Sequence, residues 1–428
     1  DWYCNVNFWG NNEYHDGFSY DNWGGFNLLA RLNLHNGEVI GYLLDSVRFW
    51  VQEFDIDGLR LDTADVLDFD FMRSLRQLAN EVKPDFWLMG EVIHGDYSRW
   101  VNEQTLHSVT NYHLHKALFS AHNDHNYFEI AHTVKRQLDM GPGSRLRLYN
   151  FVDNHDVERI ASKLRNKANY LPVHILLYTL PGIPSVYYGS EFGIEGKKNS
   201  HSDATLRPSL DLEELKSRNS ACEKLTAALG ALRNSEPELR SGTYRELQLT
   251  TTKYAFSRGR IIVTVNNDGG KASFDLPFEG CWRGALWGKT VCSESGILHL
   301  EADGNSGEIW LPAAECSQAG DAPDGKDARC PDLSEFSIRQ DLSQEENSGG
   351  SFYRSDAGGE GLQFERSGRR GTWHPADRRW RGTGGHGDSG SGGSHKEGIG
   401  GRGGSGPPGR GLGERRGGIC GGAQKPGQ

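Results

Sequence analysis

The chain has 428 residues, with 47 basic and 57 acidic side chains and a formal net charge of −10. This acidic balance argues against a general nucleic-acid-binding protein. The sequence contains no apolar run of about 18 residues or more, so it predicts no membrane-spanning helix and no membrane partner. A chain of this length can form two or three domains with one sizeable core.

Aromatic residues are concentrated at the start of the chain, where the first 35 residues are predicted to form loops. Nine of them fall within the first 26 residues. Their mixture with Asn, Asp and Gly suits a loop that stacks flat rings on sugar faces. Loop aromatics tucked against a core explain the same pattern, so both interpretations stay open.

Helices and short strands alternate over the next 150 residues. Residues 36–53 have apolar side chains at three- and four-residue spacing, which predicts an amphipathic helix. Further helices are predicted at 68–82, around 123–138 and up to about residue 180. Strands that alternate with helices at this spacing predict βαβ units and a parallel sheet. The predicted strands are 54–62, 85–92, 106–112, 147–153 and 183–188.

The C-terminal part of the chain differs in pattern. From about residue 241 to 312, short alternating runs broken by Gly and Asn predict a small antiparallel β domain. Residues 349–428 hold 28 of the 56 glycines, mixed with Arg, Ser and Pro. Such a segment cannot bury enough apolar surface to offset its ordering entropy, so we predict a disordered extension. An RGG-like RNA-binding tail is the alternative interpretation.

Seven cysteines occur at irregular spacing, which fits neither a disulfide framework nor a zinc site. We therefore expect free thiols in a reducing compartment and a cytoplasmic protein. The cysteines are Cys4, Cys222, Cys281, Cys292, Cys316, Cys330 and Cys420.

Three carboxylates lie at the ends of predicted strands, where parallel barrels place their active sites. Asp62 leaves the same strand face as Arg60, whose guanidinium would keep the carboxylate ionised. Glu91 ends an apolar strand, where a carboxyl group at the edge of a dry pocket can hold a proton for a leaving group. Asp156 follows His155 and could stabilise positive charge on a sugar ring. A single such carboxylate is more often an ion-pair or capping residue, but neighbouring barrel strands can supply the two carboxyls, about 5–5.5 Å apart, of a retaining glycosidase.

The segments DGLRLDTAD, GEV, FVDNHD and GIPSVYYGSEFG, in this order, resemble the short motifs of the α-amylase family. EFDIDGLRLD, GEVIHGDYSRW and SVTNYHLHKAL look most like its cyclomaltodextrinase, neopullulanase and maltogenic amylase branch. The resemblance covers roughly residues 1–312. It implies an α/β fold, a (β/α)8 TIM barrel, followed by a small antiparallel β-sandwich domain.

The family's first motif, an Asp followed by Asn-His on the third barrel strand, has no counterpart before residue 54. The barrel is therefore expected to lack its first three strands. The implied segments are a remnant of an inserted loop domain at 1–35, the C-terminal part of the catalytic barrel at 36–235, an all-β domain at 236–315 and a low-complexity, disordered tail at 316–428.

By this resemblance Asp62 is the nucleophile, Glu91 the acid/base and Asp156 the transition-state stabiliser of a retaining hydrolase. The implied reaction cleaves α-1,4-glucosidic bonds of maltodextrins or cyclodextrins through a covalent glycosyl-enzyme. Alternatives are transglycosylation by the same residues, an inactive fragment and a non-catalytic barrel homologue. The implied substrate-binding residues are Arg60, Asn154, His155 and, on the leaving-group side, His94. An exposed loop histidine explains His94 equally well.

A histidine cluster invites a metal interpretation, but no Cys or carboxylate joins it at ligand spacing. We predict no metal and no cofactor. The expected partner is an α-glucan or maltooligosaccharide substrate, and the resembling branch implies a homodimeric parent protein. The histidines are His113, His115, His122, His125 and His132.

Overall fold

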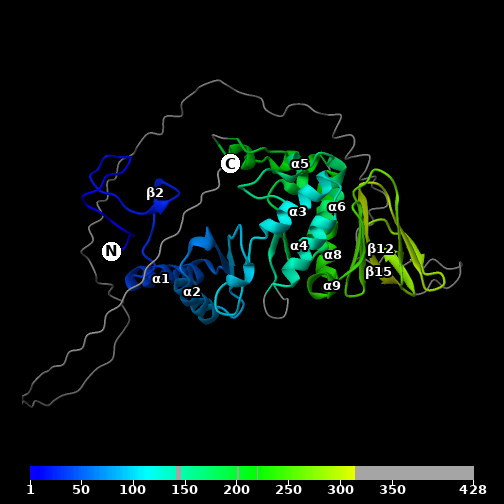
Figure 1. Cartoon of the computed structure of the whole chain (residues 1–428), viewed down its shortest axis with the longest axis horizontal. Coiled ribbons are helices and arrows are strands. Elements are labelled where there is room, and N and C mark those ends of the chain that lie inside the picture. The colour runs from blue at the N-terminus through cyan, green and yellow to red at the C-terminus, as the bar shows by residue number, and fades with distance from the viewer. Residues whose placement is uncertain (141–145, 200–201, 219, 314–428) are drawn as a thin grey trace, which may run out of the picture. The chain divides into compact units, whose positions relative to one another are not determined.

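The computed structural model describes residues 1–140, 146–199, 202–218 and 220–313. After a small antiparallel hairpin within residues 22–30, parallel strands alternate with helices, and further antiparallel strands follow from residue 244 (Figure 1). No helix of the described residues is long and apolar enough to cross a membrane. The predicted disordered tail lies outside the described residues and stays a prediction.

In the described part of the chain, five parallel strands lie side by side in chain order. They are β3 (Gly58–Leu61), β4 (Trp87–Gly90), β5 (Ser108–Val109), β6 (Tyr149–Phe151) and β7 (Ile183–Ser185). β3, β4 and β5 form one sheet, β6 pairs with β7, and a bridge between Thr110 and Tyr149 joins the two groups. The five predicted strands are confirmed, each shorter than expected. Because they are parallel, their carboxyl ends share one edge.

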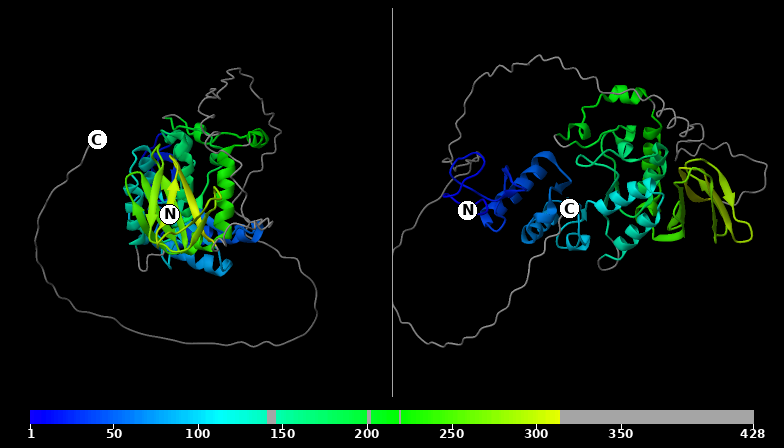
Figure 2. Two further views of the ribbon diagram at one scale, coloured as in Figure 1. Left: turned by 90° about the vertical axis from the view of Figure 1, so that its right-hand side faces the viewer. Right: turned by 45° about the horizontal axis from the view of Figure 1, so that its top comes forward.

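Two helices, α1 (Gly37–Phe54) and α2 (Phe69–Val82), lie side by side next to the first strands (blue in Figure 2). Asn36 caps the N-terminus of α1, where its side chain accepts a hydrogen bond from a first-turn amide, and Asp68 caps α2 in the same way. The buried face of α2 has helical spacing, as predicted. It consists of Phe71, Met72, Leu75, Leu78 and Ala79.

The region predicted as one long helix around 123–138 differs in the structure. α3 (Tyr112–Asn123) ends where the predicted helix was expected to begin, at residue 123. α4 (Phe128–Leu138) begins five residues later. His125 in the connection has a φ of 50°, a left-handed conformation that a continuous helix excludes. The predicted strand 106–112 is shorter for a related reason, because Tyr112 already begins α3.

Helix α6 (Tyr170–Thr179) is buried on almost every side, which its continuous apolar sequence requires. It packs against α8 (Ala221–Ser235) and against strands β10 (Ile261–Asn266) and β15 (Ser306–Ala313) of the antiparallel region (Figure 1). A single apolar cluster therefore continues from the helices into the antiparallel sheet. The short helices nearby are α5 (Ile160–Lys163), α7 (Leu212–Ser217) and α9 (Pro237–Ser241).

The antiparallel strands predicted from about residue 241 to 312 are confirmed. Its larger sheet has the strand order β13-β12-β15-β10-β9-β8, and β11 pairs with β14 in a second sheet. A cluster that includes Phe274, Leu300 and Trp310 draws on both sheets. The remaining strands are β8 (Tyr244–Leu249), β9 (Lys253–Arg258), β11 (Ala272–Leu276), β12 (Cys281–Gly284), β13 (Thr290–Cys292) and β14 (Leu298–Ala302).

The first 35 residues contain one small hairpin that was not predicted, β1 (Asn22–Trp23) and β2 (Phe26–Ala30). Gly24 and Gly25 between them both have positive φ, which favours glycine in so tight a turn. The side chains of Phe8 and Trp9 are 76% and 97% exposed, so the interpretation as aromatics tucked against a core is wrong for these two.

The expectation of free thiols is wrong for one pair of cysteines. Cys281 and Cys292 are direct partners on the neighbouring strands β12 and β13, and they form a disulfide. Strand pairing brings the two side chains together, which the irregular spacing of cysteines along the chain cannot show. Cys4 and Cys222 form no disulfide with a described residue, and the other three cysteines lie outside the described residues.

Candidate active site

Asp62 and Glu91 directly follow the adjacent parallel strands β3 and β4. Arg60, on β3, binds both of them. Its Nη1 atom lies 3.1 Å from Asp62 Oδ1, and its Nη2 atom lies 3.0 Å from Glu91 Oε2. One guanidinium therefore offsets the mutual repulsion of two carboxylates and fixes their relative positions.

The two carboxylates differ in their access to solvent. The Asp62 side chain is 78% exposed, whereas only 10% of the Glu91 side chain is exposed. Glu91 Oε1 accepts a hydrogen bond from the Tyr112 hydroxyl at 3.2 Å, and its Oε2 atom accepts one from the Thr63 backbone N–H at 3.4 Å. Asp62 is therefore open to an incoming molecule, and Glu91 is held by protein donors.

Tyr112, the first residue of α3, links two parts of the site. Its hydroxyl oxygen also accepts a hydrogen bond from Asn154 Nδ2 at 3.3 Å. Burial raises the pKa of Tyr112 to about 12, and the nearby negative charge of Glu91 adds to the effect. The phenol therefore stays protonated, and its hydroxyl donates a hydrogen bond to Glu91. Sequence reasoning missed this residue, although it lies where the third predicted strand ends.

The loop after β6 holds Asp156 through a turn that Asn154 organises. Asn154 Oδ1 accepts hydrogen bonds from the backbone N–H groups of Asp156 and Val157, at 2.8 and 3.1 Å. His155 Nε2 lies 3.0 Å from Asp156 Oδ2. The structure thus brings the three predicted residues Asn154, His155 and Asp156 into one compact turn, with the Asp156 side chain 34% exposed.

Arg207 was not predicted as a site residue. It lies in the chain segment after β7, where its Nη2 atom donates to Asp156 Oδ1 at 2.8 Å and its Nε atom donates to the His155 carbonyl oxygen at 3.1 Å. Arg207 and Asp156 are 51 residues apart in the chain, and no motif connects them. Only the fold places this guanidinium against the carboxylate.

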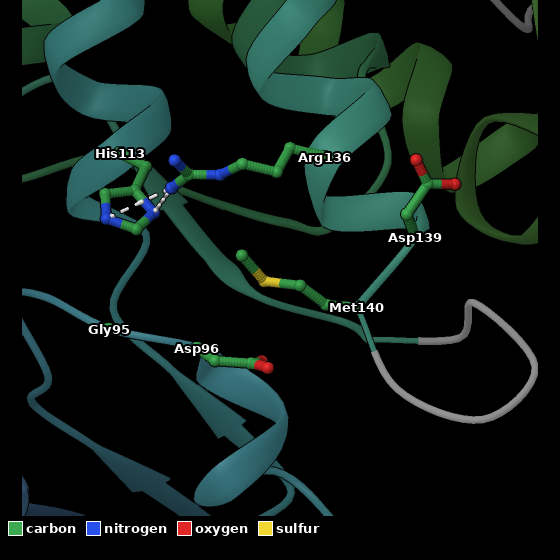
Figure 3. Close-up of a pocket in the computed structure, with 6 residues that line it drawn as sticks. All are labelled: Gly95, Asp96, His113, Arg136, Asp139 and Met140. Carbon is green, nitrogen blue, oxygen red and sulfur yellow. Dashed lines mark hydrogen bonds between the residues drawn. The ribbon is translucent and has the colours of Figure 1, made fainter.

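His94 is exposed in the loop after β4 and interacts electrostatically with His113, with no hydrogen bond to the three carboxylates among the described contacts. His113 lines a pocket of about 540 Å³ (Figure 3). Arg136 Nη2 donates to His113 Nδ1 at 2.7 Å, as Figure 3 shows. Burial, followed by the charge of Arg136, lowers the pKa of His113 and favours the neutral ring that can accept this bond.

The other predicted cluster histidines serve packing where they are buried. His115 stacks on Phe151 with ring centroids 4.9 Å apart, and His122 Nδ1 lies 2.6 Å from the Leu118 carbonyl oxygen. Burial lowers the pKa of both histidines to about 4, so their rings are neutral at pH 7. Within the residues that the structure describes, no group of three or more His, Cys, Asp or Glu side chains is arranged to hold a metal ion.

Comparison with known proteins adds independent information. Residues 4–240 match the family model described as the catalytic domain of α-amylase. The chain is 32% identical to an intracellular maltogenic amylase of Bacillus subtilis over 234 residues, which are 53% of this chain and 38% of that protein. It is 30% identical to a cyclomaltodextrinase of Thermoanaerobacter pseudethanolicus over 250 residues, which are 57% of this chain and 42% of that protein.

Among solved structures, the chain resembles an α-amylase from Geobacillus thermoleovorans complexed with acarbose. The TM-score is 0.59 at 25% identity, and the match covers 66% of this chain and 65% of the other. The chain spans about two fifths of the length of the two curated relatives described above.

Proposed function

The chain belongs to the α-amylase family, and on that premise we propose that its carboxylates cleave α-1,4-glucosidic bonds of maltodextrins or cyclodextrins with retention of configuration. The observation that carries the proposal is the double contact of Arg60 with Asp62 and Glu91. Two carboxyl groups held close together at the carboxyl ends of adjacent strands are the arrangement that a retaining glycosidase uses. The names of the relatives, a maltogenic amylase and a cyclomaltodextrinase, favour this substrate class.

In the proposed first step, a carboxylate oxygen of Asp62 attacks the anomeric carbon of the bound sugar. The glycosidic C–O bond breaks, and Glu91 gives a proton to the departing oxygen. In the second step, water attacks the same carbon while Glu91 takes a proton from it. The ester bond to Asp62 then breaks and releases the sugar. The exposure of Asp62 and the enclosure of Glu91 support this division of roles.

Asp156 is proposed to stabilise the positive charge that develops on the sugar ring and to bind its hydroxyls. Its half-buried carboxylate, held by the Asn154 turn and by Arg207, supports a fixed position for that charge. His155 and Arg60 are proposed to line the subsite of the reacting glucose. His94 is proposed to contact the leaving-group side, supported by its place in the loop directly after Glu91.

The test is to replace Asp62 by Asn and to follow the hydrolysis of maltotriose. We expect the rate to fall by at least about a thousandfold, because loss of an essential nucleophile costs several orders of magnitude. Asp70→Asn is the matched control, because this exposed aspartate pairs with Arg73 on α2, outside the site. Activity of the Asp62→Asn variant within about tenfold of wild type would remove Asp62 from the nucleophile role. Products longer than maltotriose would show transglycosylation by the same residues instead of pure hydrolysis.

A further inference from the structure

The loop that holds Asn154, His155 and Asp156 lies between two buried charged residues. Asp153 precedes the three residues and is 1% exposed, and Arg159 follows them and is fully buried. Neither residue belongs to the predicted site. Burial of a charged side chain is costly unless other groups compensate for the lost water, so the partners of these two residues define what they do.

Arg159 binds the segment that follows β7. Its Nη1 atom donates to the Tyr188 carbonyl oxygen at 2.6 Å and to Ser190 Oγ at 3.1 Å, and its Nη2 atom donates to the Leu206 carbonyl oxygen at 2.9 Å. Its guanidinium carbon lies 4.2 Å from the centre of the Tyr187 ring. Three oxygen acceptors and a cation–π contact offset part of the cost of burying the charge, while the buried Nε atom has no hydrogen-bond partner among the described residues.

Asp153 reaches the same segment through Ser190. The Ser190 hydroxyl lies 2.8 Å from both carboxylate oxygens of Asp153, and the Ile160 backbone N–H donates to Asp153 Oδ2 at 2.7 Å. Ser190 therefore joins both ends of the loop, because it contacts Asp153 and Arg159 at once. The backbone N–H of Arg159 also donates to the Gly196 carbonyl oxygen at 3.0 Å.

We infer that Arg159 is a positioning residue. It fixes the loop that carries Asp156 relative to the segment that carries Arg207. Leu206, whose carbonyl oxygen Arg159 binds, directly precedes Arg207, and Arg207 in turn binds Asp156. Arg159 touches neither of the proposed reacting carboxylates and acts through the two backbone segments. The inference rests on the proposed function, since it assigns Arg159 to the same reaction.

The physical argument is one of geometry. A planar guanidinium with several fixed acceptors orders the loop more strictly than an ammonium group can, because its donors point in set directions. Misplacement of a charged group by about 1 Å can reduce a catalysed rate by about a hundredfold. Loss of Arg159 should therefore reduce the rate of the chemical step more than it weakens the binding of substrate.

The test compares Arg159→Met and Arg159→Lys with wild type in the full chain, with maltotriose as substrate. We expect Arg159→Met to lower kcat about a hundredfold with KM changed less than about threefold, and Arg159→Lys to recover part of the loss. Arg165→Met is the matched control, since Arg165 is exposed and binds Asp124 and the Asn123 carbonyl oxygen. Its kcat should equal that of wild type.

Three outcomes would overturn the inference. The first is a folded Arg159→Met protein with kcat within about threefold of wild type. The second is a loss of kcat that disappears when the assay is cooled well below the unfolding midpoint, because that loss would reflect stability alone. If Arg159→Met does not fold, Ser190→Ala is tested instead, because Ser190 contacts both Arg159 and Asp153. An unchanged kcat in Ser190→Ala is the third outcome that would overturn the inference.

Hydrogen exchange separates failure of the inference from failure of the proposed function. In Arg159→Met, the amides of Asp156 and Val157 should exchange faster, while those of β9 and β10 should stay as in wild type. If wild type shows no Asp62-dependent hydrolysis, the proposed function fails, and the exchange of these two amides still decides whether Arg159 orders the loop. Unchanged exchange at both amides would contradict the inference.

Discussion

At the scale of single residues, Arg60 explains how two carboxylates can lie together at the end of the sheet. The two carboxylates would repel each other, and the shared guanidinium binds both. Its planar fork offers separate N–H groups to two acceptors, which a lysine ammonium cannot do with the same fixed geometry. Arg60 therefore sets the relative position of the proposed nucleophile and acid/base.

Tyr112 is expected to contribute to activity through its hydroxyl alone. In Tyr112→Phe the hydrogen bond to Glu91 is lost and the ring stays in place, so we expect kcat/KM for maltotriose to fall about tenfold. Tyr42→Phe on the exposed surface of α1 is the control and should leave kcat/KM unchanged. Equal values for wild type and Tyr112→Phe would exclude Tyr112 from the site.

Glu308, in β15, should make the stability of the protein depend on pH. Burial raises its pKa to about 7 from an ordinary value of 4.5, although the backbone N–H groups of Leu286, Trp287 and Ile309 oppose this effect. The folded state therefore binds the proton more tightly than the unfolded state. The contribution of Glu308 to the free energy of unfolding is full below about pH 4.5 and is lost as the pH rises through about 7.

Urea unfolding of wild type and Glu308→Gln at pH 5 and pH 8 measures this effect. Wild type should lose more stability between the two pH values than the variant, by an amount on the order of 3 kcal/mol or less. Only the change with pH is compared, because the variant also loses an acceptor for the Trp287 N–H. The same change with pH in both proteins would mean that Glu308 does not titrate in this way.

Part of the site could be predicted from single residues and part could not. Arg60 and Asp62 are two positions apart, so strand geometry alone puts them on one face. The contact of Arg60 with Glu91 depends on the register between β3 and β4, which pairs Arg60 with Met89. Arg207 depends on a segment without any motif. Such contacts between distant segments leave no signal in local spacing.

At the scale of elements, the presence of the five parallel strands and the bounds of α1 and α2 could be predicted, whereas the break between α3 and α4 could not. Buried parallel strands appear as short apolar runs between helical stretches, which is a strong pattern. The break between α3 and α4 depends instead on the left-handed conformation of His125. No Gly or Pro lies between the two helices, so the sequence carries no strong signal for this break. The disulfide of the β12–β13 hairpin depends on cross-strand pairing and was missed for the same reason as the Arg60–Glu91 contact.

The β12–β13 hairpin should be stabilised by its disulfide. The two cysteines are 11 positions apart in the chain, and a cross-link of this loop size is expected to raise the free energy of unfolding by about 2–3 kcal/mol. The double variant Cys281→Ser/Cys292→Ser should unfold at lower urea concentration than wild type. A reducing agent should lower the midpoint of wild type and leave that of the variant unchanged. Equal midpoints for the two oxidised proteins would show that the disulfide adds no stability.

At the scale of the whole molecule, the apolar cluster around α6 unites the parallel region with the antiparallel sheet. The carboxyl ends of the parallel strands can therefore present a site while the helices behind them are anchored in a large core. The expectation that the barrel lacks its first three strands stays a prediction, as does the low-complexity tail. In the structure, Asp62 and Glu91 directly follow parallel strands, and Asp156 lies in the loop after another, as predicted from the strand pattern and the motifs.

The central claim is that Asp62 forms a covalent bond with the sugar while Glu91 moves the proton. The most direct measurement is mass spectrometry of the full chain after reaction with 5-fluoro-α-D-glucosyl fluoride, a substrate whose glycosyl-enzyme breaks down slowly. We predict one added fluoroglucosyl group on the peptide that contains Asp62, and none in the Asp62→Asn variant. A label on Glu91 or another residue, or release of a product of inverted configuration by an active protein, would contradict the claim.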